Sequence, residues 1–418
     1  MPGSASSATN GPAWPQRAAR NPPRHPPIPP RCSPKAPSLW PKRHRPELLR
    51  LPPSQWGGKG VGVASGMPPA PVTTGPSAMR WSALGGLQYF LNPCHTAFGP
   101  WTARVLGRWR TDDAPAAHLA GRTCVVTGAN AGIGKAAALA LARRSAEVHL
   151  LCRNRERGAA ARAEIARAAQ NEAVFLHVVD LASVAEIRAF VGAFEKDHGR
   201  VDVLINNAAV MPNALAYTAE GLETALATNV VGFWALTQGL LPLLERARAS
   251  ASSPDYASGR VVNVISGGMF SARMHLPTVE AGVKAGHGAL DREGYSGIAL
   301  YALHHRCRQI LTQRLAASTG LLVSCCHPGW VETPGLANAN DMASFYSRMK
   351  WCLRTPEEGA DTAVWLAAAP QAASAEQNGL YWFDRRPRPA HKPLAGTSPA
   401  PEEAEALEAF LNELLLTV

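Results

Sequence analysis

The phrase Thr127-Gly128-Ala129-Asn130-Ala131-Gly132-Ile133-Gly134-Lys135 is the part of the sequence best suited to binding a phosphorylated ligand. It follows an apolar run and precedes an Ala-rich stretch of helical character. Glycines at such a junction let the backbone turn tightly and approach a pyrophosphate, and the first turn of the helix supplies free N–H groups and a positive dipole end. An ordinary Gly-rich turn is the alternative, but a glycine triplet between a strand and a helix predicts a dinucleotide site.

Cys152-Arg153-Asn154 ends the second apolar run and indicates which dinucleotide is bound. Arg153 lies 19 residues after Gly134, where dehydrogenases that prefer NAD usually carry an acid for the adenosine ribose. No carboxylate stands here, and a guanidinium can instead pair bidentately with a 2′-phosphate. We therefore predict NADP(H) as the cofactor; the alternative is that Arg153 is a solvated surface side chain.

Several phrases resemble elements of the short-chain dehydrogenase/reductase (SDR) family over roughly residues 79–418. Thr127–Gly134 is similar to the TGxxxGxG element, Asn206-Asn207-Ala208-Ala209 to the NNAG element, and Pro328–Thr333 to the PG element on the nicotinamide side. Ala209 adds a methyl group where the family usually has Gly. The resemblance implies a fold, a cofactor class and an oxidoreductase activity, but it does not determine the substrate.

Three further phrases, Ser266–Met269, His327–Trp330 and Phe383–Pro387, are similar to one mammalian branch of this family. The resemblance implies one set of cofactor-binding residues: Gly128, Asn130, Gly132, Ile133, Gly134, Arg153, Asn154, Asp180, Leu181, Asn207, Ala208, Tyr301, His305, Pro328, Gly329 and Thr333.

The resemblance also implies four catalytic residues, Asn229, Ser266, Tyr301 and His305. Tyr301 would donate or remove the proton on the carbonyl or alcohol oxygen, and Ser266 would polarise that oxygen while hydride passes to or from the nicotinamide. A free Tyr has a pKa near ~10, so it needs help to act at neutral pH. In the family, a Lys four residues further on stabilises the phenolate and holds the nicotinamide ribose.

Position 305 carries His instead of that Lys. His305 shares a helical face with Tyr301 and can bond a ribose hydroxyl, but with an ordinary pKa of ~6.5 it is mostly neutral at pH 7. Arg306 is about 100° further round the helix and is expected to face elsewhere. We predict that cofactor binding is kept while turnover is weakened. The alternative function is a catalytically impaired NADP(H)-binding sensor or scaffold.

The elements that must position these residues alternate along the chain after Gly121. Continuous apolar strands separated by helices are typical of a parallel sheet covered on both faces. The sequence therefore predicts an α/β fold, a Rossmann doubly wound parallel sheet of about seven strands flanked by helices. The expected strands are Thr123–Thr127, Val148–Cys152, Val174–Val179, Val203–Asn206, Val261–Ser266, Leu321–Cys325 and Leu380–Phe383. The expected helices are Lys135–Arg144, Ala159–Ala169, Val184–Lys196, Leu222–Arg248, Tyr301–Ala317 and Ala360–Ala368.

Tyr301 lies 35 positions after Ser266, and the segment between them includes five glycines from Gly282 to Gly297. We expect either a flexible loop beside the substrate opening or a tolerated surface insertion, because long loops without periodicity are often functional.

The charge distribution argues against a nucleic-acid partner. The net charge is +11, but residues 1–78 hold ten of the 42 Lys and Arg residues and only one of the 31 acids, so the remainder is nearly neutral.

The eight cysteines form no CxxC pair, which favours a reducing intracellular compartment, and no metal site is predicted. No apolar run approaches the ~18 residues needed to span a bilayer. The expected partner is a small carbonyl or alcohol, apolar by family analogy, and a homo-oligomer is compatible with the sequence.

Residues 1–78 differ in composition from the rest, with 19 of the 35 prolines. This predicts a disordered leader. A basic, acid-poor leader is also similar to an organelle transit segment, and a start of translation at Met79 is a third interpretation. The expected location is the cytoplasm, or a plastid or mitochondrion if the leader is a transit segment. A lead-in helix is expected over 79–118, followed by the SDR domain over 119–418 with a C-terminal helix.

Overall fold

The computed structural model describes residues 118–251, 258–283, 290, 295–372 and 375–418. The chain divides into two units, Met1–Gly60 and Val61–Val418, and every described residue belongs to the second unit. The expectations for the leader and for the lead-in helix before residue 118 lie outside the described residues.

Eight strands form one sheet in the order β3-β2-β1-β4-β5-β6-β7-β8. The strands from β1 to β7 pair in parallel with their neighbours, and β8 pairs antiparallel with β7. The strand order reverses at β1 and β4, as in a doubly wound sheet, which confirms the predicted fold class. The strands are β1 (Thr123–Thr127), β2 (Glu147–Cys152), β3 (Val174–Val178), β4 (Val203–Asn206), β5 (Arg260–Val264), β6 (Leu322–Cys326), β7 (Tyr381–Phe383) and β8 (Arg386–Arg388).

The eighth strand corrects the prediction of about seven. Arg386-Pro387-Arg388 lacks the apolar character by which the other strands were predicted. It pairs with β7 because Asp384 and Arg385 adopt φ of 52° and 53°, which closes a two-residue hairpin. Pro387 is tolerated because β8 is an edge strand.

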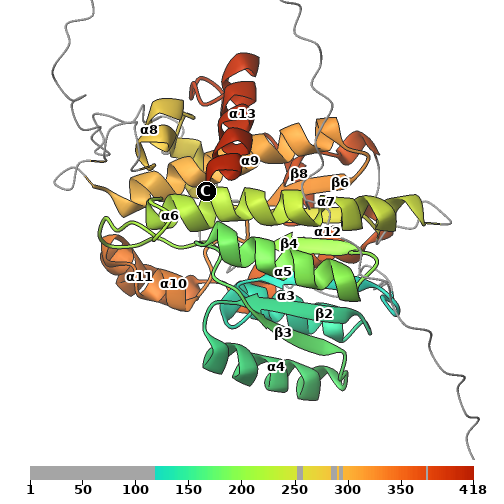
Figure 1. The fold of residues 1–418 in the computed structure, drawn as a ribbon. Coiled ribbons are helices and arrows are strands. Elements are labelled where there is room, and N and C mark those ends of the chain that lie inside the picture. Colours follow the sequence, from blue (N-terminus) through green and yellow to red (C-terminus); the bar gives the residue numbers. More distant parts are fainter. Residues whose placement is uncertain (1–117, 252–257, 284–289, 291–294, 373–374) are drawn as a thin grey trace, which may run out of the picture. The chain divides into compact units, whose positions relative to one another are not determined.

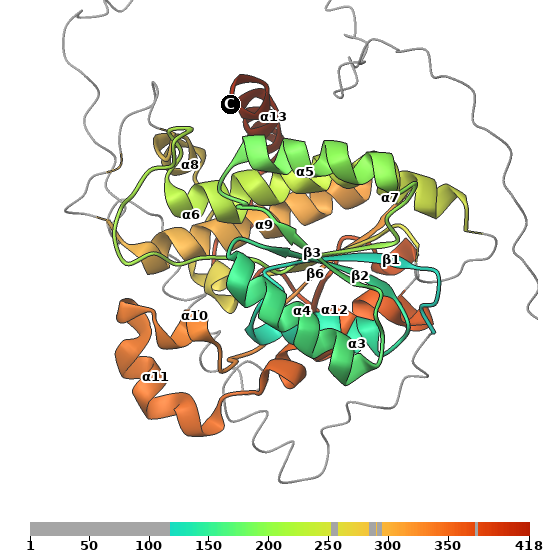
Figure 2. The same ribbon diagram turned by 60° about the horizontal axis from the view of Figure 1, so that its bottom comes forward.

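Helices cover both faces of the sheet (Figures 1 and 2). One face carries α3 (Gly132–Ala142), α4 (Arg155–Ala169) and α12 (Pro356–Ala368), and the other carries α5 (Val184–Asp197), α7 (Phe233–Ala249) and α9 (Gly297–Ser318). Val125 and Val126, consecutive in β1, enter opposite apolar cores. The sheet is therefore buried on both sides, which explains why its strands have continuous rather than alternating apolar sequences.

The segment Leu222–Arg248, predicted as one helix, is divided. It consists of α6 (Thr224–Leu226), a π-helical turn over Ala227–Gly232 and α7. The helical run Thr224–Ala249 is long and apolar enough to cross a membrane, although the sequence predicted no such run. However, 78% of its most apolar stretch is buried inside the fold, as in the core helix of a globular domain.

Two other boundaries differ from the prediction near the expected site. α9 begins at Gly297, before Tyr301, because the Ser296 hydroxyl accepts a hydrogen bond from the amide of Ala299 (3.3 Å). The expected loop after Ser266 contains a 3₁₀ helix (Gly267–Ser271) and α8 (Leu276–Ala281) in its described part.

The remaining elements are α10 (Pro334–Ala337), α11 (Ala343–Met349), α13 (Pro401–Thr417) and short 3₁₀ turns at Asn340–Met342, Lys350–Cys352, Pro370–Ala372 and Ala375–Gln377.

Candidate active site

The glycine-rich turn after β1 forms a close-packed cradle. Gly128 and Gly132 have φ of +64° and +54°, which L side chains rarely adopt. A Cβ atom on Gly134 would lie 2.5 Å from both the Asn207 Nδ2 atom and the Gly128 carbonyl oxygen. The turn therefore has room for backbone only, as close approach to a diphosphate requires.

Thr127 and Asn207 join this turn to the end of β4. The Thr127 hydroxyl oxygen accepts hydrogen bonds from the amides of Asn207 and Ala208, both at 2.9 Å. The Asn207 side-chain amide donates to the Thr127 carbonyl oxygen at 3.0 Å. Asn207 and Ala208, predicted from the resemblance, therefore lie directly beside the cradle.

The start of α3 is suited to an anion. Its N-cap residue, Ala131, provides no side-chain cap, and no acid stands in the first turn. Asn130 and Ile133 flank this N-cap, and both are half-buried. The first turn of the helix thus brings no negative side chain of its own to the positive end.

Arg153 and Asn154 follow β2, and their side chains differ in how firmly they are held. The Arg153 side chain is 61% exposed, and its Nη1 atom lies 3.9 Å from the Asp180 Oδ2 atom, a weak surface pair. The Asn154 Oδ1 atom accepts from the amide of Arg157 (2.8 Å) and so caps α4. Asp180 accepts from the amide of Ala182 (2.9 Å), and the neighbouring Leu181 is buried.

Tyr301 and His305 lie together on α9. Their ring centroids are 4.2 Å apart at an interplanar angle of 65°. His305 is 2% exposed, and among the described residues neither of its ring nitrogens has a hydrogen-bond partner. Burial lowers the pKa of His305 well below its usual value, so the ring is neutral at pH 7. Burial also raises the pKa of Tyr301.

Arg308 is a buried cation on the face of α9 that carries Tyr301 and His305, and it was not among the residues predicted from the sequence. Its Nη2 atom donates to the Ala208 carbonyl oxygen (2.8 Å) and its Nη1 atom to the Val264 carbonyl oxygen (3.1 Å). Its guanidinium carbon lies 4.8 Å from the centre of the Phe233 ring. No carboxylate pairs with it in the described part of the chain. The available signal was the spacing, because residues i, i+4 and i+7 share one helical face.

Burial lowers the pKa of Arg308 to about 10, which leaves it charged at pH 7. This charge opposes the effect of burial on the pKa of Tyr301. Arg306, in contrast, donates to the carbonyl oxygens of Met269 (2.7 Å) and Ala272 (3.2 Å), away from Tyr301. Of the two arginines, only Arg308 acts on the phenol.

Ser266 lies two residues beyond β5, beside α9. Its hydroxyl oxygen accepts from the amide of Gly268 (3.2 Å). A Cβ atom on Gly268 would lie 3.5 Å from the Ala302 Cβ atom and 3.6 Å from the Ser266 Oγ atom. Ser266 therefore lies next to the turn of α9 that carries Tyr301.

Asn229 lies in the π-helical turn and is fully buried. Its Oδ1 atom accepts from the amide of Val210, and its Nδ2 atom donates to the carbonyl oxygen of the same residue, both at 2.8 Å. The side chain therefore holds the segment that follows β4.

A second arginine that was not predicted from the sequence, Arg354, supports Pro328 and Gly329. Arg354 pairs bidentately with Asp384 (2.7 and 3.0 Å) and donates to the Pro328 carbonyl oxygen (3.3 Å). Gly329 has φ of +82°, and a Cβ atom there would lie 2.5 Å from the Arg354 Nε atom. The PG element thus depends on contacts far away in the sequence.

Thr333 connects the PG element to the glycine-rich turn. A Cβ atom on Gly132 would lie 3.1 Å from the Thr333 methyl carbon. The Thr333 hydroxyl oxygen accepts from the amide of Leu336 (3.3 Å) and caps α10. This contact brings the two ends of the expected dinucleotide site together.

A hollow of about 230 Å³ lies near the start of α9. It is lined by Asn213, Ala214, Leu215 and Tyr295. Tyr295 lies six residues before Tyr301, and its hydroxyl donates to the buried Glu223 carboxylate (3.2 Å).

The chain is similar to known dehydrogenases over most of its described part. The family model for short chain dehydrogenase matches residues 122–287. Dehydrogenase/reductase SDR family member 12 of Bos taurus is 41% identical over 298 residues, which cover 71% of this chain and 87% of the relative. Retinol dehydrogenase 11 of Mus musculus is 33% identical over 260 residues, covering 60% and 74%. A crystal structure of an uncharacterised protein from Mycobacterium paratuberculosis matches with a TM-score of 0.53 and 26% identity, covering 74% of this chain and 97% of that one.

Proposed function

Because the chain belongs to the short-chain dehydrogenase/reductase family, as its motifs predicted, we propose that it is an NADP(H)-dependent oxidoreductase that interconverts a carbonyl compound and an alcohol. The observation that supports the choice of NADP(H) is the largely exposed Arg153 guanidinium directly after β2. Its pair with Asp180 is long and solvent-screened, so a 2′-phosphate can compete for it.

The residues present fit a dinucleotide. The cradle at Gly128, Gly132 and Gly134 excludes side chains, and the first turn of α3 offers a positive helix end without an acid. The unpartnered ring nitrogens of His305 are available to a ribose hydroxyl. When bound, the nicotinamide ring supplies or accepts the hydride.

The chain's own residues handle the proton and the oxygen. In the reducing direction Tyr301 donates its O–H proton to the carbonyl oxygen, and in the oxidising direction it removes that proton. Ser266 donates a hydrogen bond to the same oxygen, which stabilises the charge that develops there. Asn229 acts as a positioning residue through the segment at Val210.

Arg308 replaces the fixed positive charge that His305 lacks. His305 contacts Tyr301, and His304 is a neighbour of His305. Burial lowers the pKa of His304 to about 3 and that of His305 well below its usual value. The guanidinium of Arg308 is therefore the charge that favours the phenolate form of Tyr301. Arg308 acts through Tyr301 and is a positioning residue.

An apolar substrate is part of the proposal. A relative, retinol dehydrogenase 11, is named for an alcohol that is largely hydrocarbon. The hollow beside Tyr295 includes the apolar side chains of Ala214 and Leu215.

The second candidate function is an NADP(H)-binding sensor or scaffold without efficient turnover. It is favoured by the neutral, buried His305 at the position of the family's Lys. NADPH binding without oxidation of NADPH across a panel of aldehydes and ketones would favour this function over the enzyme.

The test of the cofactor assignment compares Arg153→Ala with Arg167→Ala, which removes an exposed arginine from the far end of α4. Loss of charge-assisted hydrogen bonds, each contributing ~1.5–3 kcal/mol, should weaken NADPH binding about 10- to 100-fold in Arg153→Ala. NADH affinity should change little, and Arg167→Ala should leave both affinities unchanged. Fluorescence titration of the wild-type chain and the two variants with NADPH and NADH measures the six dissociation constants. Equal weakening for NADPH and NADH would contradict the role of Arg153, and failure of the wild-type chain to bind either would contradict both functions.

A further inference from the structure

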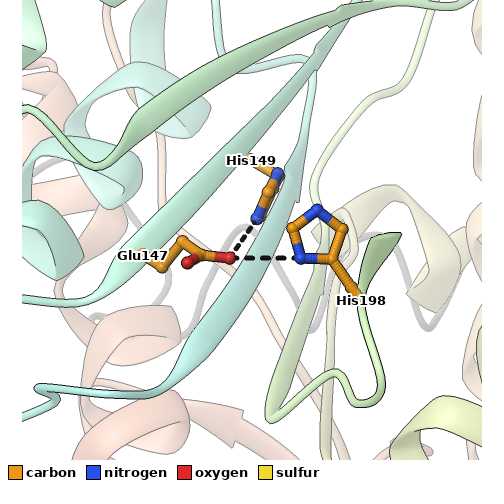
Figure 3. Close-up of side chains that lie close together, drawn as sticks. All are labelled: Glu147, His149 and His198. Carbon is orange, nitrogen blue, oxygen red and sulfur yellow. Dashed lines mark hydrogen bonds and ion pairs between the residues drawn. The ribbon is translucent and has the colours of Figure 1, made fainter. Parts of the chain in front are cut away.

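Three potential metal ligands lie together at the end of the sheet opposite the candidate active site (Figure 3). Glu147 and His149 are the first and third residues of β2 and therefore point to the same side of the strand. His198 follows α5, which covers that side of the sheet. The sequence predicted no metal site, although the i, i+2 spacing of Glu147 and His149 on a strand is a signal for one.

The Glu147 carboxylate is shared by two imidazole rings. Its Oε1 atom lies 2.8 Å from the His149 Nε2 atom and 3.4 Å from the His198 Nδ1 atom. In the described part of the chain, Glu147 forms no ion pair with a Lys or Arg. The carboxylate thus faces ring nitrogens rather than a cationic side chain.

Packing holds both rings in place. The His198 ring stacks on Phe194 with centroids 4.2 Å apart, and the His149 ring meets the same Phe194 edge-on at 4.8 Å. The Nδ1 atom of His149 lies 2.9 Å from the Nε2 atom of His177 on β3. A site whose ligands are already oriented by packing and by a second layer of hydrogen bonds needs little rearrangement to bind an ion.

We propose that Glu147 Oε1, His149 Nε2 and His198 Nδ1 bind one Zn²⁺ ion, with His177 orienting His149 from behind. Two imidazoles and a carboxylate are a common zinc ligand set, and three protein ligands leave a fourth position for water. Glu147 and His198 are 36% and 26% exposed, so that position opens toward solvent, whereas His149 is buried.

The ligand spacing agrees with this ion. With metal–ligand bonds of ~2.0–2.2 Å, the ligand atoms of a tetrahedral zinc site lie ~3.3–3.6 Å apart. The three atoms here all lie within 4.8 Å of one another, and the distances of 2.8 and 3.4 Å from the Glu147 Oε1 atom to the two ring nitrogens require only small adjustments.

The contacts of the His149 ring allow the tautomer that a metal ligand requires. Its Nδ1 atom lies 2.9 Å from the His177 Nε2 atom, so an Nδ1–H donated to His177 leaves the Nε2 lone pair for the ion.

A zinc ion at this site would link the end of α5 to the start of β2, away from the proposed cofactor site. β2 runs from Glu147 to Cys152, so at ~3.3 Å per residue the ion lies roughly 15 Å from the end of the strand that precedes Arg153. We therefore expect zinc to stabilise the fold and to leave NADPH affinity unchanged.

The experiment uses the full chain, freed of metal with EDTA and dialysed. Zn²⁺ is titrated in competition with a chromophoric chelator, and Co²⁺ absorption reports whether the site is tetrahedral. The wild-type chain should bind one ion at the cluster and unfold at a higher temperature when it is saturated. His198→Gln and the isosteric Glu147→Gln should each weaken zinc at least tenfold, and His177→Phe should weaken it about tenfold through the second layer.

The matched control is His118→Gln, which changes an exposed histidine outside the cluster. Its zinc affinity should equal that of the wild-type chain. Circular dichroism and NADPH titration verify that each variant is folded, and Glu147→Gln serves if His198→Gln does not fold. Saturable zinc binding that survives both substitutions with unchanged affinity, or no saturable binding by the wild-type chain, would overturn the proposal.

Discussion

Replacing Arg308 by Met removes a buried positive charge from the face of α9 that carries Tyr301. The proposed role of Arg308 is to hold down the pKa of Tyr301, which burial raises. Without that charge the phenol should lose its proton only at higher pH. The change should therefore move the pH dependence of alcohol oxidation, for which Tyr301 must act as a base.

The size of the shift follows from the helix. Seven residues of α9 separate the two Cα atoms by ~10.5 Å along the axis, and both side chains lean toward the N-terminus, so we take a charge separation of about 10 Å. At an effective dielectric constant of ~20, two unit charges at that distance interact by about 1.7 kcal/mol. This corresponds to roughly 1.2 pKa units, and we expect an upward shift of about 1 unit.

The assay is kcat/KM for the oxidation of a long-chain primary alcohol by NADP⁺ between pH 6 and 9, followed by NADPH absorbance. In Arg308→Met the rising limb should move to higher pH, so that activity at pH 7 falls about tenfold. Arg308→Lys should keep most of the wild-type profile because it keeps the charge. Arg314→Met is the matched control, since it removes a cation from the solvent side of α9, where Arg314 pairs with Glu408.

Arg308→Met also removes the donors to the carbonyl oxygens of Ala208 and Val264. NADPH titration and thermal unfolding therefore verify that the variant still folds and binds. An Arg308→Met enzyme that binds NADPH and keeps the wild-type pH profile, or an Arg308→Lys enzyme shifted as far as Arg308→Met, would refute the reasoning.

Three further predictions concern the same site. His305→Lys should raise kcat at pH 7 by about tenfold through a second cation near Tyr301, and unchanged turnover would show that position 305 does not limit the reaction. Gly134→Ala should weaken NADPH binding at least about tenfold and lower the unfolding temperature, because the new Cβ atom would lie 2.5 Å from the Asn207 Nδ2 atom; normal binding would contradict the close-packed cradle. His304 takes up a proton near pH ~6.5 when unfolded but only near pH 3 when folded, so the free energy of unfolding should fall as the pH decreases from 6.5 toward 3. Urea unfolding at pH 7 and pH 5 measures the change in the free energy of unfolding, and a smaller change in His304→Phe would attribute the effect to the His304 ring.

Local sequence patterns were sufficient to predict the parallel strands of the sheet and the turn after β1. The parallel strands from β1 to β7 and the glycine-rich turn were predicted within a few residues, because continuous apolar runs and glycines at a strand end constrain the chain locally. Boundaries that depend on caps were less accurate. α9 begins at Gly297 because Ser296 caps it, and the π-helical turn that contains Asn229 has no signal of its own in the sequence.

The missed residues all act through contacts between distant parts of the chain. Arg354 supports Gly329 through Asp384, and Arg308 reaches the ends of β4 and β5 from α9. Glu147 and His149 meet His198 only because α5 packs across the start of β2. Spacing along the chain places Arg308 on the face of Tyr301 and Glu147 on the side of His149, but it does not indicate the contacts with Asp384, with the ends of β4 and β5, or with His198.

The sequence by itself determined the family and the fold class, since both are carried by short motifs and apolar runs whose geometry is local. Only the tertiary structure decided which charge acts on Tyr301, which side chains are already engaged as caps, and where ring nitrogens face a carboxylate. Electrostatic and coordination chemistry depends on distances and desolvation, and both arise only when helices and strands that are far apart in the chain pack against each other.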